Sequence, residues 1–297
     1  MDNYLIFSAA RTGSSYLTSA VTKQIRCLEP NTFYGGELWN WSEYFKLSQP
    51  GTVGPGGFDS LEKDPGKLNS YDSSQPQGDN PHIYLGEGGI IHRNVRATNW
   101  NEVAPVSFRR AREESQRRLT MLENSYFPWV IKIHPDHLDC LDIPRFNRLV
   151  ERGNTRVVLL YRSHLWDWFL SWVAVRSTGL YQHTHKGEEW ERPEVKPQQL
   201  SPTFLHTWYA NACSFINMSL NYRAQADHVV AYESFSGDPR RDAGCITGLD
   251  LFPETPHQVK LWSQKDKENM IANLNEVKEL FRDYCKLLGY SGGRLYL

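Results

Sequence analysis

The chain contains four short runs of apolar residues that predict buried strands. Each run is four to six residues long and is followed by small or polar residues, a pattern typical of strands in the interior of a sheet. After the first run, apolar residues recur every three or four positions from Tyr16 to Ile25, which predicts a helix. The four runs are residues 4–7, 129–133, 156–161 and 228–232.

Helical patterns between the other runs complete an alternation of strands and helices. They predict helices at about residues 105–124, directly after Arg162, at 202–223 and at 265–288. Such an alternation is typical of an α/β fold with a mainly parallel central sheet and helices on both faces. We find no internal repeat and no linker, so we expect a single domain over residues 1–297.

Two polar stretches interrupt this pattern and are predicted to be insertions into the domain. They lie near residues 50–127 and 182–202. Within the first stretch, residues 50–81 are rich in Gly, Pro, Ser, Asn and Asp. This composition predicts a long irregular loop, and such loops often cover a site.

The charge balance narrows the classes of partner. The 297 residues include 33 Lys and Arg against 34 Asp and Glu, a net charge of -1, which favours neither a nucleic-acid binder nor a membrane-surface binder. No apolar run reaches the ~18 residues of a membrane span, and no secretory signal is seen. The five cysteines are scattered and never form a CxxC pair, so we expect no disulfide framework, no zinc site and a cytoplasmic location.

The most informative segment joins the first strand to the first helix. Residues 8–17 read Ser-Ala-Ala-Arg-Thr-Gly-Ser-Ser-Tyr-Leu. Backbone N–H groups at such a turn, together with the positive end of the helix dipole, bind phosphate-like anions. The hydroxyls of Thr12, Ser14 and Ser15 add donors, and the forked guanidinium of an arginine, Arg11, suits phosphate or sulfate oxygens. The alternative interpretation is an N-capped helix with an arginine on the surface.

Two common nucleotide-binding motifs are missing from this segment. A Walker A loop reads GxxxxGK[ST], with a lysine that reaches the terminal phosphates, but no lysine follows Gly13. The GxGxxG dinucleotide motif is missing as well. These differences count against an ordinary kinase or ATPase, although the arrangement of a strand, a turn and a helix still favours phosphate binding.

A second candidate segment lies at the end of the third predicted strand. Arg162 follows this strand directly, at the edge where open parallel sheets bind ligands. Ser171 lies within the next predicted helix, and the long side chain of Arg162 can fold towards it. Taken alone, an arginine at a strand end is more typical of a surface ion pair.

Together the two segments resemble the P-loop-like sulfotransferases, which use 3′-phosphoadenosine-5′-phosphosulfate (PAPS) as sulfonate donor. The family's first motif, S-x-x-R-[ST]-G-[ST]-[ST]-x-L, is similar to residues 8–17. Its second motif, an arginine after a strand and then a helix with Ser-Trp, is similar to Arg162 and Ser171-Trp172. The resemblance is nearest to the branch that includes bacterial trehalose sulfotransferase.

The resemblance implies a P-loop NTPase-like sulfotransferase fold with a nucleotide held at two places. The first loop would hold the 5′-phosphosulfate, and the second segment would hold the 3′-phosphate. The residues carried over to the first role are Arg11, Thr12, Gly13, Ser14, Ser15 and Tyr16, and those carried over to the second are Arg162 and Ser171.

Three weaker matches follow in the family's order along the chain. Glu37, within Gly-Gly-Glu-Leu-Trp-Asn, is similar to the glutamate taken as the family's catalytic base. Lys132 lies in a segment that resembles the family's K-[LI] strand, and Tyr232-Glu233 resembles its late Y-E segment. The spacing from Arg11 to Glu37 is long for the nearest branch, which leaves the base assignment open. Glu43 is a competing candidate for the base.

Sulfonate transfer needs a base for the acceptor's proton and cations for the developing charge. Glu37 is the expected base, and Arg11 and Lys132 are the expected catalytic cations. His134, two residues beyond Lys132, is an alternative base because imidazole titrates near neutral pH. A sulfonate carries less charge than a phosphoryl group, so we expect side-chain cations to suffice without a metal.

The expected reaction is transfer of a sulfonate from PAPS to a hydroxyl of a carbohydrate or small metabolite. The two insertions would form the acceptor side, with a pocket lined by Trp39, Trp41, Tyr44, Phe45 and Tyr181. The competing enzyme is an ATP- or GTP-dependent small-molecule kinase in which Arg11 replaces the usual lysine. The competing non-enzyme is a nucleotide-binding protein that has lost its chemistry. The oligomeric state, a homodimer included, stays open.

Overall fold

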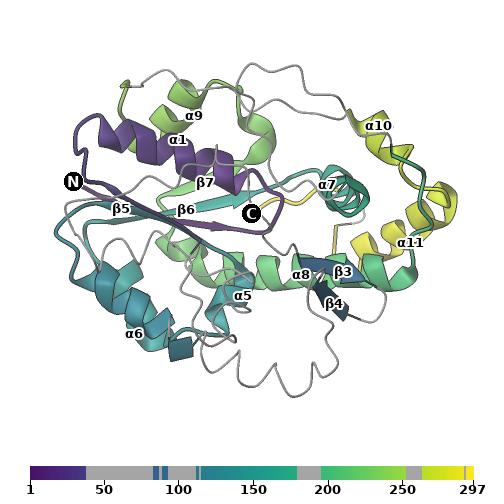
Figure 1. Cartoon of the computed structure of the whole chain (residues 1–297), viewed down its shortest axis with the longest axis horizontal. Helices are drawn as coiled ribbons and strands as arrows, with labels where there is room; N and C mark the ends of the chain where they lie inside the picture. Colours follow the sequence, from purple (N-terminus) through teal and green to yellow (C-terminus); the bar gives the residue numbers. More distant parts are fainter. Residues whose placement is uncertain are drawn as a thin grey trace.

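Figure 1 shows the computed structural model of the chain, in which helices lie on both faces of a central sheet. The predicted loop over residues 50–81, the competing base Glu43 and the five aromatic residues of the expected pocket lie outside the described residues. The structure describes residues 1–37, 83–86, 89–92, 112–113, 115–178, 195–251, 263–290 and 292–297.

Five parallel strands form the central sheet in the order β2-β5-β1-β6-β7. Four of them are the runs predicted from the sequence, so the expected α/β class with a mainly parallel sheet is confirmed. A separate antiparallel hairpin joins β3 (Ile83–Gly86) to β4 (Gly89–His92). The strands of the central sheet are β1 (Asn3–Ser8), β2 (Phe33–Glu37), β5 (Trp129–Ile133), β6 (Thr155–Tyr161) and β7 (His228–Ala231).

The central strands are apolar on both faces because helices cover both sides of the sheet. In β1, Leu5 and Phe7 pack into the larger of two cores. Tyr4 and Ile6, at the alternate positions, pack into the smaller core on the opposite face. For this reason β1 reads as a continuous apolar run in the sequence rather than as an alternation of apolar and polar residues.

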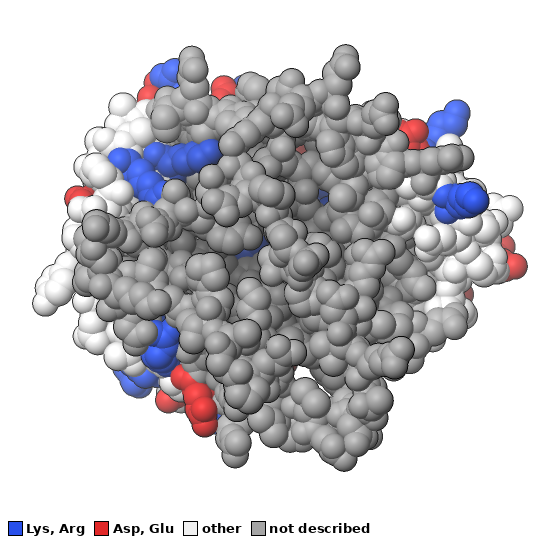
Figure 2. All heavy atoms as spheres, viewed as in Figure 1, with Lys and Arg blue, Asp and Glu red and all other residues white. Residues whose placement is uncertain are grey.

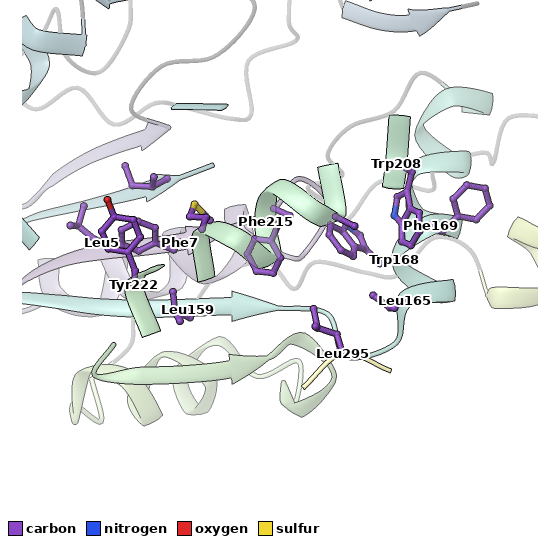
Figure 3. Close-up of a cluster of buried hydrophobic side chains, with 14 of the residues drawn as sticks. Leu5, Phe7, Leu159, Leu165, Trp168, Phe169, Trp208, Phe215, Tyr222 and Leu295 are labelled. Carbon is purple, nitrogen blue, oxygen red and sulfur yellow. The ribbon is translucent and has the colours of Figure 1, made fainter. Parts of the chain in front are cut away.

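Helices α1 (Ser14–Arg26) and α9 (Pro239–Thr247) cover the face with the smaller core and lie above the sheet in Figure 1. In the larger core, Trp168 of α7 packs against Trp208 and Phe215 of α8, as Figure 3 shows. The helices that contribute residues to this larger core are α5 (Pro135–Leu138), α6 (Ile143–Val150), α7 (Leu165–Thr178), α8 (Pro202–Tyr222) and α11 (Leu274–Leu287). The short helix α10 (Gln264–Glu268) contacts α7.

The structure corrects the predicted helix at residues 265–288. That segment contains two helices, α10 and α11, because the residues between them pair with another part of the chain. The backbone of Ile271 forms a bridge with Gln198. The Asn273 side chain accepts from the N–H of Leu200 at 2.9 Å and donates to its carbonyl at 3.0 Å. In the bridge, the Met270 carbonyl accepts from Gln198 and the N–H of Ala272 donates to Gln198, so these backbone groups are not available for a continuous helix.

Other elements differ from the sequence predictions or are described only in part. The strand β2 was not predicted, and the predicted strand 228–232 ends at Ala231, where the short 3-10 helix η2 (Tyr232–Ser234) begins. Of the predicted helix at 105–124, the structure describes helical backbone at 112–113 and 115–123. A second 3-10 turn, η1 (Arg223–Gln225), follows α8.

Charges of both signs lie close together on the described surface, and Figure 2 shows blue and red side chains around the rim of one face. Arg145 forms an ion pair with Glu123, and Arg240 forms one with Asp250. This interleaving agrees with the balanced charge of the sequence.

The strand order creates a switch point between β1 and β6. After β1 the chain leaves towards β2 at one edge of the sheet, whereas after β6 it leaves towards β7 at the other edge. In open α/β sheets, ligands bind in the crevice outside the carboxyl ends of two such strands. The segments that follow β1 and β6 begin at Ala9 and Arg162, and they are the two segments that the sequence analysis singled out.

Candidate functional site

The turn after β1 uses left-handed backbone at two positions. Arg11 has φ 69° and is the single non-glycine residue with positive φ in the described part of the chain, while Gly13 has φ 82°. Such a conformation is strained for arginine and persists only where the surrounding structure enforces it. Strained backbone of this kind gathers at ligand-binding sites.

The first turn of α1 has neither a side-chain cap nor an acidic residue. Gly13 is the N-cap and has no side chain to accept from the first N–H groups, and no Asp or Glu lies in the first turn. The positive end of the helix dipole therefore has no carboxylate from its own helix. This local chemistry favours an anion from outside the helix.

Lys132 brings a buried cation to the same turn. Its neighbours Ile131 and Ile133 face the larger core, so Lys132 projects from the opposite face of β5, towards α1. Its side chain is buried, and its Nζ donates to Ser15 Oγ at 2.9 Å. The sequence analysis predicted Lys132 and Ser15 separately, and the fold brings them into contact.

Two hydroxyls of this region donate to protein acceptors. Thr12 is buried, and its Oγ1 donates to the Ala9 carbonyl at 2.7 Å, which closes the turn. The Tyr16 hydroxyl donates to Asp242 Oδ2 at 2.8 Å, across the contact between α1 and α9. Burial, followed by this hydrogen bond, raises the pKa of Tyr16 far above its ordinary value. Thr12 and Tyr16 thus shape the turn and anchor its helix, and Ser14 is buried beside them.

Arg162 lies directly after β6 with only 8% of its surface exposed. Its Nη1 donates to the Asp167 carbonyl at 2.8 Å, and its Cζ lies 4.2 Å from the centroid of the Tyr232 ring. Its Nε is buried and has no hydrogen-bond partner among the described residues. A buried N–H without a partner is costly, so this arrangement favours an acceptor from a ligand.

Helix α7 connects this arginine to the turn after β1. The indole Nε1 of Trp168 donates to the Ala10 carbonyl at 2.8 Å. Ser171, the second residue predicted for this segment, is buried, and its Oγ donates to the Trp168 carbonyl at 2.6 Å. Trp168 therefore holds the two segments together, a role that the sequence analysis missed because the tryptophan carried no motif.

Glu233 occupies the start of α7. One carboxylate oxygen accepts from the N–H and the hydroxyl of Ser163 at 2.9 and 3.0 Å, and the other accepts from the N–H of His164 at 3.3 Å. Burial works to raise the pKa of Glu233, but these hydrogen bonds outweigh it and lower the pKa below its ordinary value. Of the two helices that begin at the switch point, α7 thus has an anion supplied by the protein, and α1 has none in its own first turn.

Two of the three candidate bases lie at the ends of neighbouring strands, and the third, Glu43, lies outside the described residues. The backbone of Glu37 is paired with that of Lys132 at the end of β2. His134 follows β5, is buried, and has Nδ1 2.8 Å from the Ser8 carbonyl oxygen. Because a carbonyl can only accept, Nδ1 carries the proton and the basic lone pair lies on Nε2. The N–H of His134 donates to His137 Nδ1, which fixes the turn that follows.

Tyr232 is the residue whose importance the sequence analysis understated. It appeared there only within a weak Y-E match, yet its ring contacts Arg162 and lies against Gly13. The parallel register of β6 and β7 pairs Tyr161 with Ala231, so the residues after them, Arg162 and Tyr232, become neighbours. A prediction of strand order would have been needed to find this contact.

Within the described ranges, no group of three or more His, Cys, Asp and Glu side chains is arranged to hold a metal ion. None of the described helices is both long and apolar enough to cross a bilayer. All five cysteines are free thiols. Comparisons of the chain with models of protein families, with curated proteins and with solved structures found no match.

Proposed function

We propose that the protein is a sulfotransferase that moves a sulfonate from PAPS to a hydroxyl of a carbohydrate or small metabolite, on a P-loop-like sulfotransferase fold. The observation that carries the proposal is the pair of positively polarised groups at one switch point. The uncapped start of α1, with Lys132 against it, lies after β1, and the buried Arg162 lies after β6. A ligand with two separate anionic groups suits this arrangement, and PAPS is such a ligand.

The donor set fits a nucleotide with a 5′-phosphosulfate and a 3′-phosphate. The start of α1, with Arg11, Ser14 and Ser15, would hold the phosphosulfate through backbone and side-chain donors. Arg162 would hold the 3′-phosphate, because its buried Nε has no hydrogen-bond partner within the described part of the chain and can donate to a phosphate oxygen. The start of α7 is already occupied by Glu233, which supports α1 as the helix that receives the ligand's anion.

PAPS supplies the activated sulfonate when bound, and the chain's residues provide a base and cations around it. Lys132 lies against the first turn of α1, where a cation would stabilise charge on the departing phosphate oxygen. Glu37 is the proposed base that takes the acceptor's proton, with His134 and Glu43 as rivals. Among the rivals, His134 has its Nδ1 proton held by Ser8, so Nε2 is the nitrogen that would accept a proton.

We further propose that the enzyme works in the cytoplasm without a metal. Five free thiols are compatible with a reducing compartment. The charge that magnesium neutralises in phosphoryl transfer would here be met by Arg11, Lys132 and Arg162. This distinguishes the proposal from the competing kinase, whose activity would need magnesium.

The first test is calorimetric titration with 3′,5′-bisphosphoadenosine in the presence of EDTA, with ATP plus magnesium as the comparison. The proposal expects metal-independent binding of the bisphosphate, followed by its release from PAPS when suitable acceptor sugars are screened. Binding of ATP alone would favour the kinase. Binding of the bisphosphate without turnover on any acceptor would favour a non-catalytic nucleotide-binding protein. Binding of neither nucleotide would contradict the proposal.

A further inference from the structure

Tyr232 contacts both halves of the candidate site. It is the first residue of η2, directly after β7, and the register of β6 and β7 places it beside Arg162. The same ring lies against Gly13, at the start of α1. No other ring in the described residues is shown to contact both positions.

One face of the ring bears the Arg162 guanidinium, with Cζ 4.2 Å from the ring centroid. The N–H groups of a guanidinium lie in its own plane. A guanidinium that lies over an aromatic face therefore keeps them available as hydrogen-bond donors. One of these donors, Nη1, bonds to the Asp167 carbonyl. The ring and this hydrogen bond together hold the guanidinium, whose buried Nε has no hydrogen-bond partner among the described residues.

The edge of the same ring fills the space where Gly13 lacks a side chain. A Cβ on Gly13 would lie 2.4 Å from Cδ2 and 2.6 Å from Cε2 of Tyr232. Such distances are far shorter than a carbon–carbon contact, so a residue with a Cβ cannot occupy position 13 while the ring is in place. Gly13 is thus required by the close approach of Tyr232 as well as by its φ of 82°.

We propose that Tyr232 is a positioning residue that sets the separation between the start of α1 and the Arg162 guanidinium, and so selects ligands with two anionic groups over ligands with one. The inference rests on the proposed function, in which those two groups hold the two ends of a nucleotide. Without the ring, α1 would still begin at Ser14, but Arg162 would lose the surface that holds its plane. Binding of a single anion at α1 would then persist while binding of the second anion would weaken.

The variants Tyr232→Phe and Tyr232→Leu distinguish the effect of the aromatic ring from the effect of side-chain volume. Phenylalanine keeps the aromatic face and edge, and leucine keeps apolar volume without a π-face. Tyr161→Leu is the matched control. Tyr161 is also a tyrosine next to Arg162, since it directly precedes it in the sequence, but its side chain packs against the larger core. Each variant is titrated with 3′,5′-bisphosphoadenosine and with 5′-AMP, which lacks the 3′-phosphate.

Tyr232→Leu is expected to weaken bisphosphate binding about tenfold while AMP binding changes by less than about threefold. Tyr232→Phe and Tyr161→Leu are expected to keep the wild-type preference for the bisphosphate. A Tyr232→Leu variant with the wild-type preference, or one that loses both nucleotides equally, would overturn the inference.

A second measurement needs no ligand and so separates this inference from the proposed function. Melting temperatures are compared for wild type, Gly13→Ala, Tyr232→Ala and the double variant. If the ring and Gly13 are in direct contact, Gly13→Ala lowers the melting temperature less when Tyr232 is already alanine, since only the backbone strain remains. Additive shifts would overturn the contact on which the inference stands. Wild-type protein that binds neither nucleotide would contradict the proposed function and the ligand preference, whatever this cycle shows.

Discussion

The ammonium of Lys132 lies 2.9 Å from the hydroxyl of Ser15, so a buried cation of the sheet meets the positive end of α1. Both the ammonium and the N-terminal end of the helix dipole are positive at this point. An anion bound there would be attracted by both, which is the reason to test this lysine for ligand binding.

Lys132→Met tests this relationship. Methionine keeps most of the apolar stem but removes the charge and the hydrogen bond to Ser15. Binding of 3′,5′-bisphosphoadenosine is expected to weaken by about ten- to a hundredfold, since a hydrogen bond to a charged group is lost. Thermal unfolding with and without the nucleotide measures this loss, because the nucleotide should raise the melting temperature of the variant less than that of wild type. Lys278→Met, which removes a cation paired with Glu268 far along the chain on α11, is the control and should leave binding unchanged.

Arg162→Ala is expected to weaken binding of 3′,5′-bisphosphoadenosine by about ten- to a hundredfold and to leave binding of 5′-AMP nearly unchanged. The physical reason is that only the bisphosphate carries the 3′-phosphate assigned to this guanidinium. Arg162→Lys should recover little of the loss, because a lysine keeps the charge but has no planar guanidinium to lie over the Tyr232 ring or to offer a fork of donors. Calorimetric titration of both nucleotides decides the matter, and equal losses for the two would contradict the assignment.

Glu37→Gln and His134→Asn distinguish the candidate bases. The glutamine cannot accept the acceptor's proton, so we expect nucleotide binding to persist while single-turnover transfer slows by roughly 10²–10⁴. Asparagine at position 134 can keep a donor near the Ser8 carbonyl in place of Nδ1 but has no counterpart of Nε2.

The comparison of the two variants has three informative outcomes. Slow transfer in Glu37→Gln alone supports Glu37 as the base. Slow transfer in His134→Asn alone, with binding intact, moves the role to His134. Normal transfer in both directs attention to Glu43.

Glu233→Gln tests the carboxylate at the start of α7. The folded protein lowers the pKa of Glu233 below its ordinary 4.5, so its stabilising effect is complete above that pH and is lost as the pH falls through the folded value. We expect the free energy of unfolding of the variant at pH 7 to be about 1 kcal/mol lower than that of wild type, a small value because the residue is partly exposed to solvent, which screens the charge. Denaturant titrations at pH 7 and below pH 4 should show this difference shrink on acidification. A difference that stays constant would mean that the charge of Glu233 is not what stabilises the turn.

The fold was largely predictable where burial dominates the sequence. β1, β5 and β6 are buried on both faces, and each appears as an apolar run. β2 escaped prediction because it lies at the edge of the sheet and reads Phe-Tyr-Gly-Gly-Glu, in which two glycines weaken the strand signal. The break between α10 and α11 depends on pairing with Gln198, a contact that helical periodicity does not encode.

In the candidate site as well, some features could be predicted from the sequence and others depend on the tertiary fold. The turn from Ser8 to Leu17 is contiguous, so its residues could be identified together. The contacts of Lys132 with Ser15 and of Trp168 with Ala10 join residues that are 117 and 158 positions apart, and they follow from strand order and helix packing. The contact of Tyr232 with Gly13 depends on the same tertiary arrangement.

The position of β1 in the middle of the sheet has a consequence for protein synthesis. β1 precedes the other four strands in the sequence, yet Tyr4 pairs with Val130 on one side and with Arg156 on the other. At about 5–20 residues per second, a ribosome needs on the order of ten seconds to make either neighbour. Until then the turn after β1 has no neighbouring strands to hold its shape. Strand pairs between residues far apart in the sequence also form slowly. We therefore expect the nascent chain to acquire the two halves of the candidate site together, although one half is synthesised well before the other.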